Sequence, residues 1–194
     1  RSRTVYSVAV QENGKILVGG DFTTINGQSN TFGIARLNAD GSIDTSFNAT
    51  GPGTDGSVRA IKLQSDGKIL IGGLFTSYNG VANNYVARLN ADGSLDTAFT
   101  TAIAGGVDNA VYSIALQVDG KILLAGDFTR CSGVTRSRLT RLNIDGSIDP
   151  QINFGLGANS FISSVLLQVR NGIEQIVIGG GFTSLDRKST RLNS

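Results

Sequence analysis

The sequence predicts an all-β protein built from a repeated antiparallel unit, and three observations support this prediction. One pattern recurs along the 194 residues at a spacing of 53, so that Val5, Val58 and Val111 open three similar segments. Apolar and polar residues alternate at the start of each segment with the period of a half-buried strand. Asn-Gly or Asp-Gly pairs then follow, and such pairs favour the left-handed backbone angles of tight hairpin turns.

The strands of one unit follow each other in a regular order, shown here for the second unit. Alternating residues 58–64 predict a first strand, and the Asp-Gly pair at 66–67 predicts the turn that ends it. The apolar run 69–71 is typical of a strand buried on both faces. Glycines 72–73 indicate a place where neighbouring backbones approach closely. Residues 87–89 predict a third strand, and another Asp-Gly turn leads into a short fourth. No segment has convincing helical periodicity.

Four short antiparallel strands in about 53 residues are typical of one β-propeller blade. We therefore predict a partial propeller of about three and a half four-stranded blades. The predicted units are 1–57, 58–110 and 111–160, with a partial fourth at 161–185. Because propellers close with roughly 4–8 blades, we expect the natural chain to continue at both ends and to supply the missing blades. A parallel β-solenoid is the alternative, although its coils are usually shorter and lack paired Asp-Gly hairpins.

The residues VAVQENGKILVGGDFTTINGQ and IARLNADGSIDTSF closely resemble the delta-60 repeat, a propeller-forming family of bacterial proteins. The resemblance covers residues 4–185 and recurs three times in full. It implies a propeller of about seven blades in a large secreted or cell-surface bacterial protein. It brings no defined catalytic site and no established ligand. The GGxF segments also resemble kelch blades, but the kelch Trp is absent.

The last residues, 186–194, depart from the repeat. Phe182 and Arg191 are only 9 residues apart, whereas Phe75 and Arg88 are 13 apart. The string DRKSTRLNS resembles the in-frame translation of a common sequencing adapter, so we expect a non-native tail. The alternative is a shortened native repeat. The tail carries three basic residues and one acidic residue, so the net charge of +2 disappears without it.

The composition excludes several kinds of active site. There is no His, which removes the Ser-His-Asp triad, the Cys-His pair and the HExxH zinc motif. The single cysteine, Cys131, cannot form an internal disulfide or a CxxC site and is interpreted as a small loop or core residue. No apolar run approaches the roughly 18 residues of a membrane span. Nucleic-acid binding would need a basic stripe with interleaved aromatics, and none is present. We expect no membrane insertion and no nucleic-acid partner.

Most carboxylates lie at repeated turn positions, which favours a structural role over a catalytic one. These residues are Asp40, Asp44, Asp66, Asp92, Asp96, Asp119, Asp145 and Asp149. The other acids offer no pair that would flank one bond, as glycosidase chemistry requires. We therefore predict no catalytic, cofactor-binding or metal-binding residue, and no cofactor.

Segment 38–44 offers oxygen atoms at alternate positions around Gly41, as a calcium loop does. We favour a turn in which Asn and Asp bond their own backbone, because Asp-Gly between apolar runs already explains the pattern. The loop is also short and lacks the terminal Glu of a calcium loop.

One arginine occupies the same position in each full unit: Arg36, Arg88 and Arg141. Asp21 and Asp127 could pair with the first and the third. Leu74 stands at that position in the second unit, so Arg88 would need another partner, such as Asp96. These arginines could line a ligand channel. We favour ion pairs that tie strands or blades together, because the planar guanidinium suits fixed pairs. Tyr6, Arg59 and Tyr112 are interpreted as ordinary strand residues.

Segments 49–57, 101–110 and 155–160 differ between units, whereas the strands do not. Loops on a rigid scaffold often carry recognition, and these have few charges, which suits a neutral ligand such as a glycan. We expect a non-enzymatic scaffold or binding surface for a protein or glycan. The resemblance to the repeat family, and nothing else in the sequence, implies that the protein is extracellular or located at the bacterial cell surface. The alternative is part of a propeller enzyme, for example a carbohydrate-active one, whose catalytic residues lie outside this chain.

Overall fold

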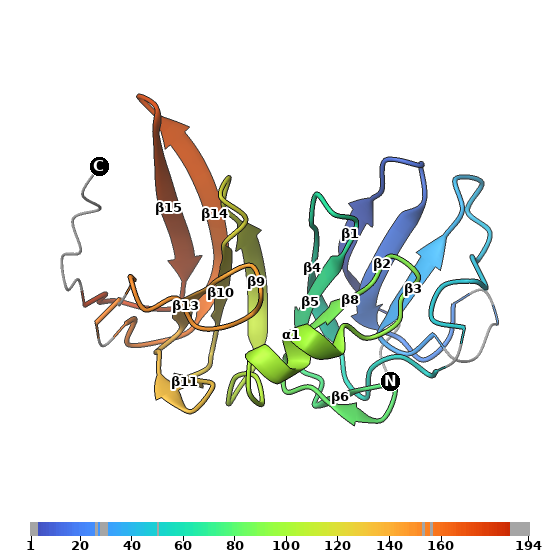
Figure 1. Ribbon diagram of the computed structural model, residues 1–194, viewed down its shortest axis with the longest axis horizontal. Helices are drawn as coiled ribbons and strands as arrows, with labels where there is room; N and C mark the ends of the chain where they lie inside the picture. Colours follow the sequence, from blue (N-terminus) through green and yellow to red (C-terminus); the bar gives the residue numbers. More distant parts are fainter. Residues whose placement is uncertain are drawn as a thin grey trace.

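The computed structural model describes residues 4–25, 27, 31–49, 51–152, 154–155 and 157–186. Within these residues it consists of small antiparallel sheets and one short helix (Figure 1), which confirms the all-β fold class. Beyond Asp186, the tail predicted to be non-native lies outside the described residues.

Three sheets of three strands share one topology, with the second strand of each in the middle. Sheet I contains β1 (Thr4–Val10), β2 (Ile16–Asp21) and β3 (Ile34–Leu37). Sheet II contains β4 (Val58–Leu63), β5 (Ile69–Gly73) and β8 (Val86–Leu89). Sheet III contains β9 (Val111–Leu116), β10 (Ile122–Gly126) and β13 (Leu139–Leu142).

The remaining strands form hairpins. Sheet IV is the pair β14 (Ile162–Arg170) and β15 (Ile173–Gly180). Two small hairpins follow the middle strands of sheets II and III: β6 (Ser77–Tyr78) with β7 (Val81–Ala82), and β11 (Arg130–Cys131) with β12 (Val134–Thr135). Gly80 and Gly133, at the tips of these two hairpins, have positive φ, a backbone angle that glycine adopts without steric cost.

The segment expected to form a fourth strand pairs at one residue only. The three bridges are Leu37 with Ile43, Leu89 with Leu95, and Leu142 with Ile148. The chain has just left an Asp-Gly turn at each bridge, and the next residue is the aspartate that bonds the arginine of the third strand. The hydrogen bond between this aspartate and the arginine takes the place of further strand pairing.

A short helix, α1 (Thr97–Ala102), follows this segment in the second unit, where the sequence shows no convincing helical periodicity. The side chain of Asp96 caps it by accepting a hydrogen bond from the Phe99 amide, and Phe99 itself is buried. Six residues are too few to show a helical period in the sequence, so capping and one buried ring decide the conformation.

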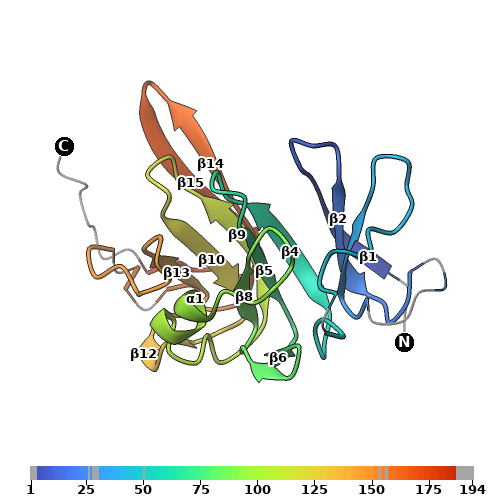
Figure 2. The same cartoon turned by 45° about the vertical axis from the view of Figure 1, so that its right-hand side comes forward.

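The sheets stack face to face in chain order (Figures 1 and 2), and β1, β4, β9 and β14 contact one another in sequence. An apolar cluster fills each gap, such as Leu17 and Ile34 against Val58 and Ile61 between sheets I and II. The middle strands β5 and β10 are buried along their whole length, as predicted. In β15 exposed and half-buried positions alternate along most of the strand instead.

The paired glycines make two different close contacts. A Cβ atom on Gly73 would lie 2.0 Å from the Ser57 carbonyl oxygen of its own sheet. A Cβ atom on Gly72 would lie 2.6 Å from Cγ1 of Val111 in the next sheet. The close approach expected at these glycines is therefore confirmed, both within a sheet and between sheets.

Candidate functional sites

The repeated arginine lies in a cluster of charged side chains beside the third strand. In sheet III, Asp149 Oδ2 accepts hydrogen bonds from Arg141 Nε at 2.7 Å and from Lys121 Nζ at 2.7 Å. The Asp149 side chain is only 1% exposed. The same cluster recurs as Arg36, Asp44 and Lys15 in sheet I, and as Arg88, Asp96 and Lys68 in sheet II.

These geometries confirm one predicted pairing and overturn two. Arg88 pairs with Asp96, as proposed from the sequence. The pairing of Asp21 with Arg36 and of Asp127 with Arg141 is wrong, and Asp127 lies 3.4 Å from Arg138 instead. The Asp-Gly turn folds the chain back beside the third strand, so the aspartate eight residues after each arginine reaches it. This constant separation of eight residues between arginine and aspartate is visible in the sequence and could have predicted all three pairs.

The guanidinium groups also join one unit to the next. Arg36 Nη1 donates to the Ala91 carbonyl at 2.6 Å, and Arg88 Nη1 donates to the Ile144 carbonyl. Each of these two guanidinium groups also lies over an aromatic ring, Phe47 or Phe99. The arginines are buried, which supports the interpretation as ties between units over that of a ligand channel.

Hydrogen bonding sets the charge of the three clustered carboxylates. Burial raises the pKa of Asp149, but hydrogen bonds from Lys121, the Gln151 amide and Arg141 outweigh it, and the pKa lies below its usual value. Burial also raises the pKa of Asp44 and Asp96. In both residues hydrogen bonds, including those from a lysine and an arginine, lower the pKa by more, so it lies below its usual value. All three are ionised at neutral pH and unsuited to act as general acids.

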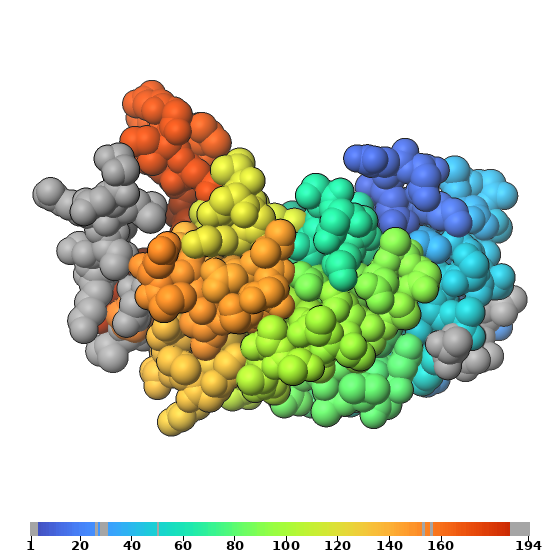
Figure 3. Space-filling model, viewed as in Figure 1, coloured from blue at the N-terminus to red at the C-terminus, as the bar shows by residue number. Residues whose placement is uncertain are grey.

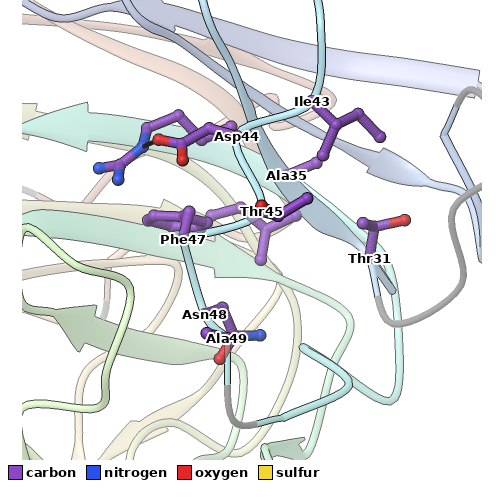
Figure 4. Close-up of a pocket in the computed structure, with 10 residues that line it drawn as sticks. Thr31, Ala35, Ile43, Asp44, Thr45, Phe47, Asn48 and Ala49 are labelled. Atoms are coloured by element: carbon purple, nitrogen blue, oxygen red, sulfur yellow. Dashed lines mark hydrogen bonds and ion pairs between the residues drawn. The ribbon is translucent and has the colours of Figure 1, made fainter.

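A small hollow of about 170 Å³ lies beside the first cluster. Figure 4 shows Asp44 and Phe47 on one side of it and Thr31 on the other. The Asp44 carboxylate is already bound by Lys15, Arg36 and Ser46. Ligand pockets usually span about 300–1,000 Å³, so this hollow suits solvent better than a metabolite.

The predicted turn in segment 38–44 is confirmed. Asp40 Oδ1 accepts from the Ser42 amide at 2.9 Å and from its hydroxyl at 2.6 Å, and Gly41 has a φ of 84°. This carboxylate oxygen therefore faces its own turn. Within the described residues, no three His, Cys, Asp or Glu side chains come together as a metal site would require.

The loops expected to carry recognition pack against small neighbouring elements. Thr54 bridges to Tyr78 and Val107 bridges to Cys131, and in each pair both residues are buried. In the third loop, Ala158 bridges to Leu185. One residue of each loop is thus used to join units.

The sequence analysis missed a repeated clip in these loops. Asp108 Oδ1 accepts from the Thr129 amide at 2.7 Å and from the Arg130 amide at 2.9 Å, and Oδ2 accepts from the Thr129 hydroxyl at 2.6 Å. Asp55 binds Thr76 and Ser77 in the same way, and Asn159 binds Thr183 and Ser184. Each clip residue stands three positions before the first strand of the next sheet, which begins at Val58, Val111 or Ile162, and this regular spacing could have revealed it.

Four side chains at the start of the first strands gather on the surface. The guanidinium carbon of Arg59 lies 3.7 Å from the centre of the Tyr6 ring. The rings of Tyr112 and Phe161 meet edge to face, with centres 6.3 Å apart. With Leu74 they form what we call the first-strand row. A pocket of about 340 Å³ opens between Arg59, Leu74, Tyr112 and Phe161. Tyr6, Arg59 and Tyr112 are strand residues, as interpreted from the sequence, but that interpretation missed this grouping.

Cys131 is fully buried, and burial raises the pKa of its thiol to about 11. The thiolate is the reactive form of cysteine, so this side chain is an inert part of the core. No helix within the described residues is long and apolar enough to span a membrane.

Stacked antiparallel sheets, a repeat of about 53 residues and recurring bonds between units define a β-propeller repeat protein. Three segments, 11–47, 64–99 and 117–151, match the family described as "Domain of unknown function (DUF5122) beta-propeller". The matches cover more than half of the chain, and the chain belongs to this family. No curated protein matches it.

Proposed function

We propose that the chain is a non-enzymatic interaction module, a set of propeller blades of the delta-60 type in an exported bacterial protein. The observation that carries this proposal is the first-strand row, in which aromatic, arginine and leucine side chains converge on one exposed pocket. The resemblance of the repeats supports the blade type and the exported location.

The polar groups that recur in every unit support a binding role over a catalytic one. Asp44, Asp96 and Asp149 each bind a lysine and an arginine, and the carboxylates of the Asp-Gly turns bind their own loops. These groups are engaged in holding the sheets and turns. The side chains of the first-strand row contact one another, and a pocket that several of them line stays open.

The composition of the row favours a protein segment as the partner. Tyr and Arg are enriched among the residues that dominate protein interfaces, and an apolar side chain would fit against Leu74, Tyr112 and Phe161. Arg59 lies at the edge of the same pocket, and its guanidinium suits a carboxylate of the partner. We therefore propose an extended peptide with an acidic residue next to an aromatic or aliphatic one.

Selection of a displayed random peptide library on the purified chain tests this proposal. Enriched peptides are expected to pair an acidic residue with an apolar neighbour and to lose at least tenfold in affinity for Arg59→Ala or Tyr112→Ala. Arg130→Ala, which removes an exposed arginine on β11, is the matched control and is expected to bind normally. Peptides that bind all four proteins equally would contradict the proposal. So would a glycan array in which sugars bind the wild type and lose binding in Tyr112→Ala.

A further inference from the structure

The turns that join the first strand to the middle strand of each sheet lie along one edge of the molecule. Figure 3 shows these tips along its upper edge, blue for sheet I, teal for sheet II, yellow for sheet III and red for sheet IV. A glutamine directly follows the first strand in the first three sheets: Gln11, Gln64 and Gln117. The three junctions between neighbouring sheets therefore share one glutamine position.

At the junction of sheets III and IV, a carboxylate binds this glutamine. Glu174 of β15 accepts a hydrogen bond from Gln117 Nε2 at 2.6 Å through Oε2, and one from the Val118 amide at 3.4 Å through Oε1. Arg141 Nη1 donates to Gln117 Oε1 at 3.1 Å, which fixes the amide with its nitrogen toward Glu174. A side-chain amide and the backbone amide of the next residue thus hold one carboxylate.

The other two junctions have no side chain in the place of Glu174. Ile176 of β15 and Ile122 of β10 hold the same place in the strand register, because each pairs with the sixth residue of its first strand. Glu174 stands two residues before Ile176, and Gly120 stands two residues before Ile122. Gly67 holds this position in sheet II. Neither glycine can reach the glutamine of the preceding sheet.

A pocket opens at each of these two junctions. The pocket between sheets II and III has a volume of about 420 Å³, and the one between sheets I and II has about 650 Å³. Both are lined by the glutamine, the residue after it and the glycine of the following sheet: Gln64, Ser65 and Gly120 in the first, and Gln11, Glu12 and Gly67 in the second. Both volumes fall in the range of ligand sites.

Gln64 is buried beside these pockets without the bonds that Gln117 makes. It is 8% exposed, and within the part of the chain that the structure describes its Oε1 has no hydrogen-bond partner. Arg88, which corresponds to Arg141, donates to the Ile144 carbonyl of the next unit instead. The amide of Gln64 therefore has unused capacity for hydrogen bonds.

Two aspartates, Asp66 and Asp119, also line the pocket between sheets II and III. Oδ1 of each accepts from the backbone amide two residues further on, at 3.1 Å. Asp119 directly follows Val118, whose amide binds Glu174. A carboxylate is thus accommodated next to this aspartate at the junction where the position is filled.

We propose that the pockets beside Gln64 and Gln11 each bind a glutamate side chain of a partner protein. The carboxylate takes the place of Glu174 and accepts from the glutamine Nε2 and from the backbone amide of Ser65 or Glu12. A glutamate is the occupant because the chain itself places one at the third junction. The pockets lie at the end of the first strands, away from the first-strand row at their start, and do not depend on that row.

Proton–nitrogen NMR of the labelled chain, titrated with the tripeptide Gly-Glu-Gly blocked at both ends, tests this proposal. The backbone amides of Ser65 and Glu12 are expected to shift, with half-saturation at about 1–10 mM peptide. The amide of Val118 is expected to stay unchanged, because Glu174 already occupies its junction. Blocked Gly-Gln-Gly is the matched peptide without the charge and is expected to cause no such shifts.

Three variants sharpen the test. Glu174→Ala opens the third junction, so the Val118 amide of this variant is expected to respond to the glutamate peptide. Gln64→Leu removes the side-chain donor between sheets II and III and is expected to weaken the Ser65 response at least tenfold. Gln175→Leu, at an exposed glutamine outside both pockets, is the matched control and is expected to respond like the wild type.

The NMR spectrum of each variant also shows whether the sheets remain folded. A Ser65 or Glu12 amide that does not shift up to about 50 mM glutamate peptide would overturn the proposal. Equal shifts with the glutamine peptide would also overturn it, because the carboxylate would not be the group recognised. A folded Glu174→Ala variant whose Val118 amide does not respond, or a folded Gln64→Leu variant that responds like the wild type, would contradict it as well.

Discussion

Asp149 joins three parts of its unit through one carboxylate. It binds Arg141 of the third strand, Lys121 at the start of the middle strand, and the Gln151 amide of the segment that follows it. Removing one partner of a buried ion pair leaves the other charge unbalanced, which costs more than the pair itself contributes. Asp44 and Asp96 hold the same place in sheets I and II.

Asp149→Ala is expected to lower the free energy of unfolding by about 3 kcal/mol, because Arg141 stays charged and buried. Urea unfolding measures the change. Asp145→Ala, four residues earlier, removes an exposed carboxylate that bonds only its own turn, and we expect a loss of about 0.5–1 kcal/mol. Equal losses in the two variants would contradict a special role for the buried cluster.

The same carboxylates predict how stability depends on pH. The pKa values of Asp44, Asp96 and Asp149 are lowered in the folded protein, so at acid pH the unfolded chain binds more protons than the folded one. Their contribution is fully present above the unfolded pKa and is lost as the pH falls through the folded values. We expect the free energy of unfolding to be level from about pH 7 to 5 and to decrease below about pH 4. Asp149→Asn removes one such group and should give a shallower decrease, and an unchanged slope would refute this origin.

At the scale of the element, the middle strands of sheets I and II each depend on a residue without a side chain, Gly19 or Gly72. Gly72 lies where Val111 and Ile114 of sheet III pack, and its backbone has no need of a left-handed angle. Its role is therefore to leave space between sheets rather than to make a turn. Gly179 has the same register position but faces open space.

Gly72→Val is expected to cost about 1–3 kcal/mol of unfolding free energy, because the new side chain overlaps Val111. Gly179→Val is expected to stay within about 0.5 kcal/mol of the wild type, because a Cβ atom at this position meets nothing within 4 Å. Thermal or urea unfolding of both variants provides the comparison. A Gly72→Val protein as stable as the wild type would show that sheets II and III do not pack as described.

Strands and turns could be predicted from the sequence where a local residue pattern favours only one kind of element. Alternation in 58–64, the Asp66-Gly67 turn and the apolar run 69–71 each correspond to an element of sheet II. Prediction failed at α1, where a cap and the buried ring of Phe99 act over six residues. It also failed for the partners of Arg36 and Arg141, which depend on how the following turn folds back.

At the scale of the whole molecule, the sheets form a stack whose two ends differ. One end presents Val5 and Val8, and the other presents Gly179 between exposed apolar side chains. The repeat could be predicted from the sequence, since Val5, Val58 and Val111 mark it. The first-strand row could not, because it requires knowing that Arg59, Tyr112 and Phe161 of successive units lie side by side.

The central claim is that sheets I, II and III pack face to face because two apolar side chains of a first strand lie over a glycine in the middle strand of the preceding sheet, and NMR of the chain tests it most directly. We predict nuclear Overhauser effects from the methyl groups of Val58 and Ile61 to the α protons of Gly19, and from those of Val111 and Ile114 to the α protons of Gly72. Absence of these signals at both Gly19 and Gly72 in the folded protein would contradict the account.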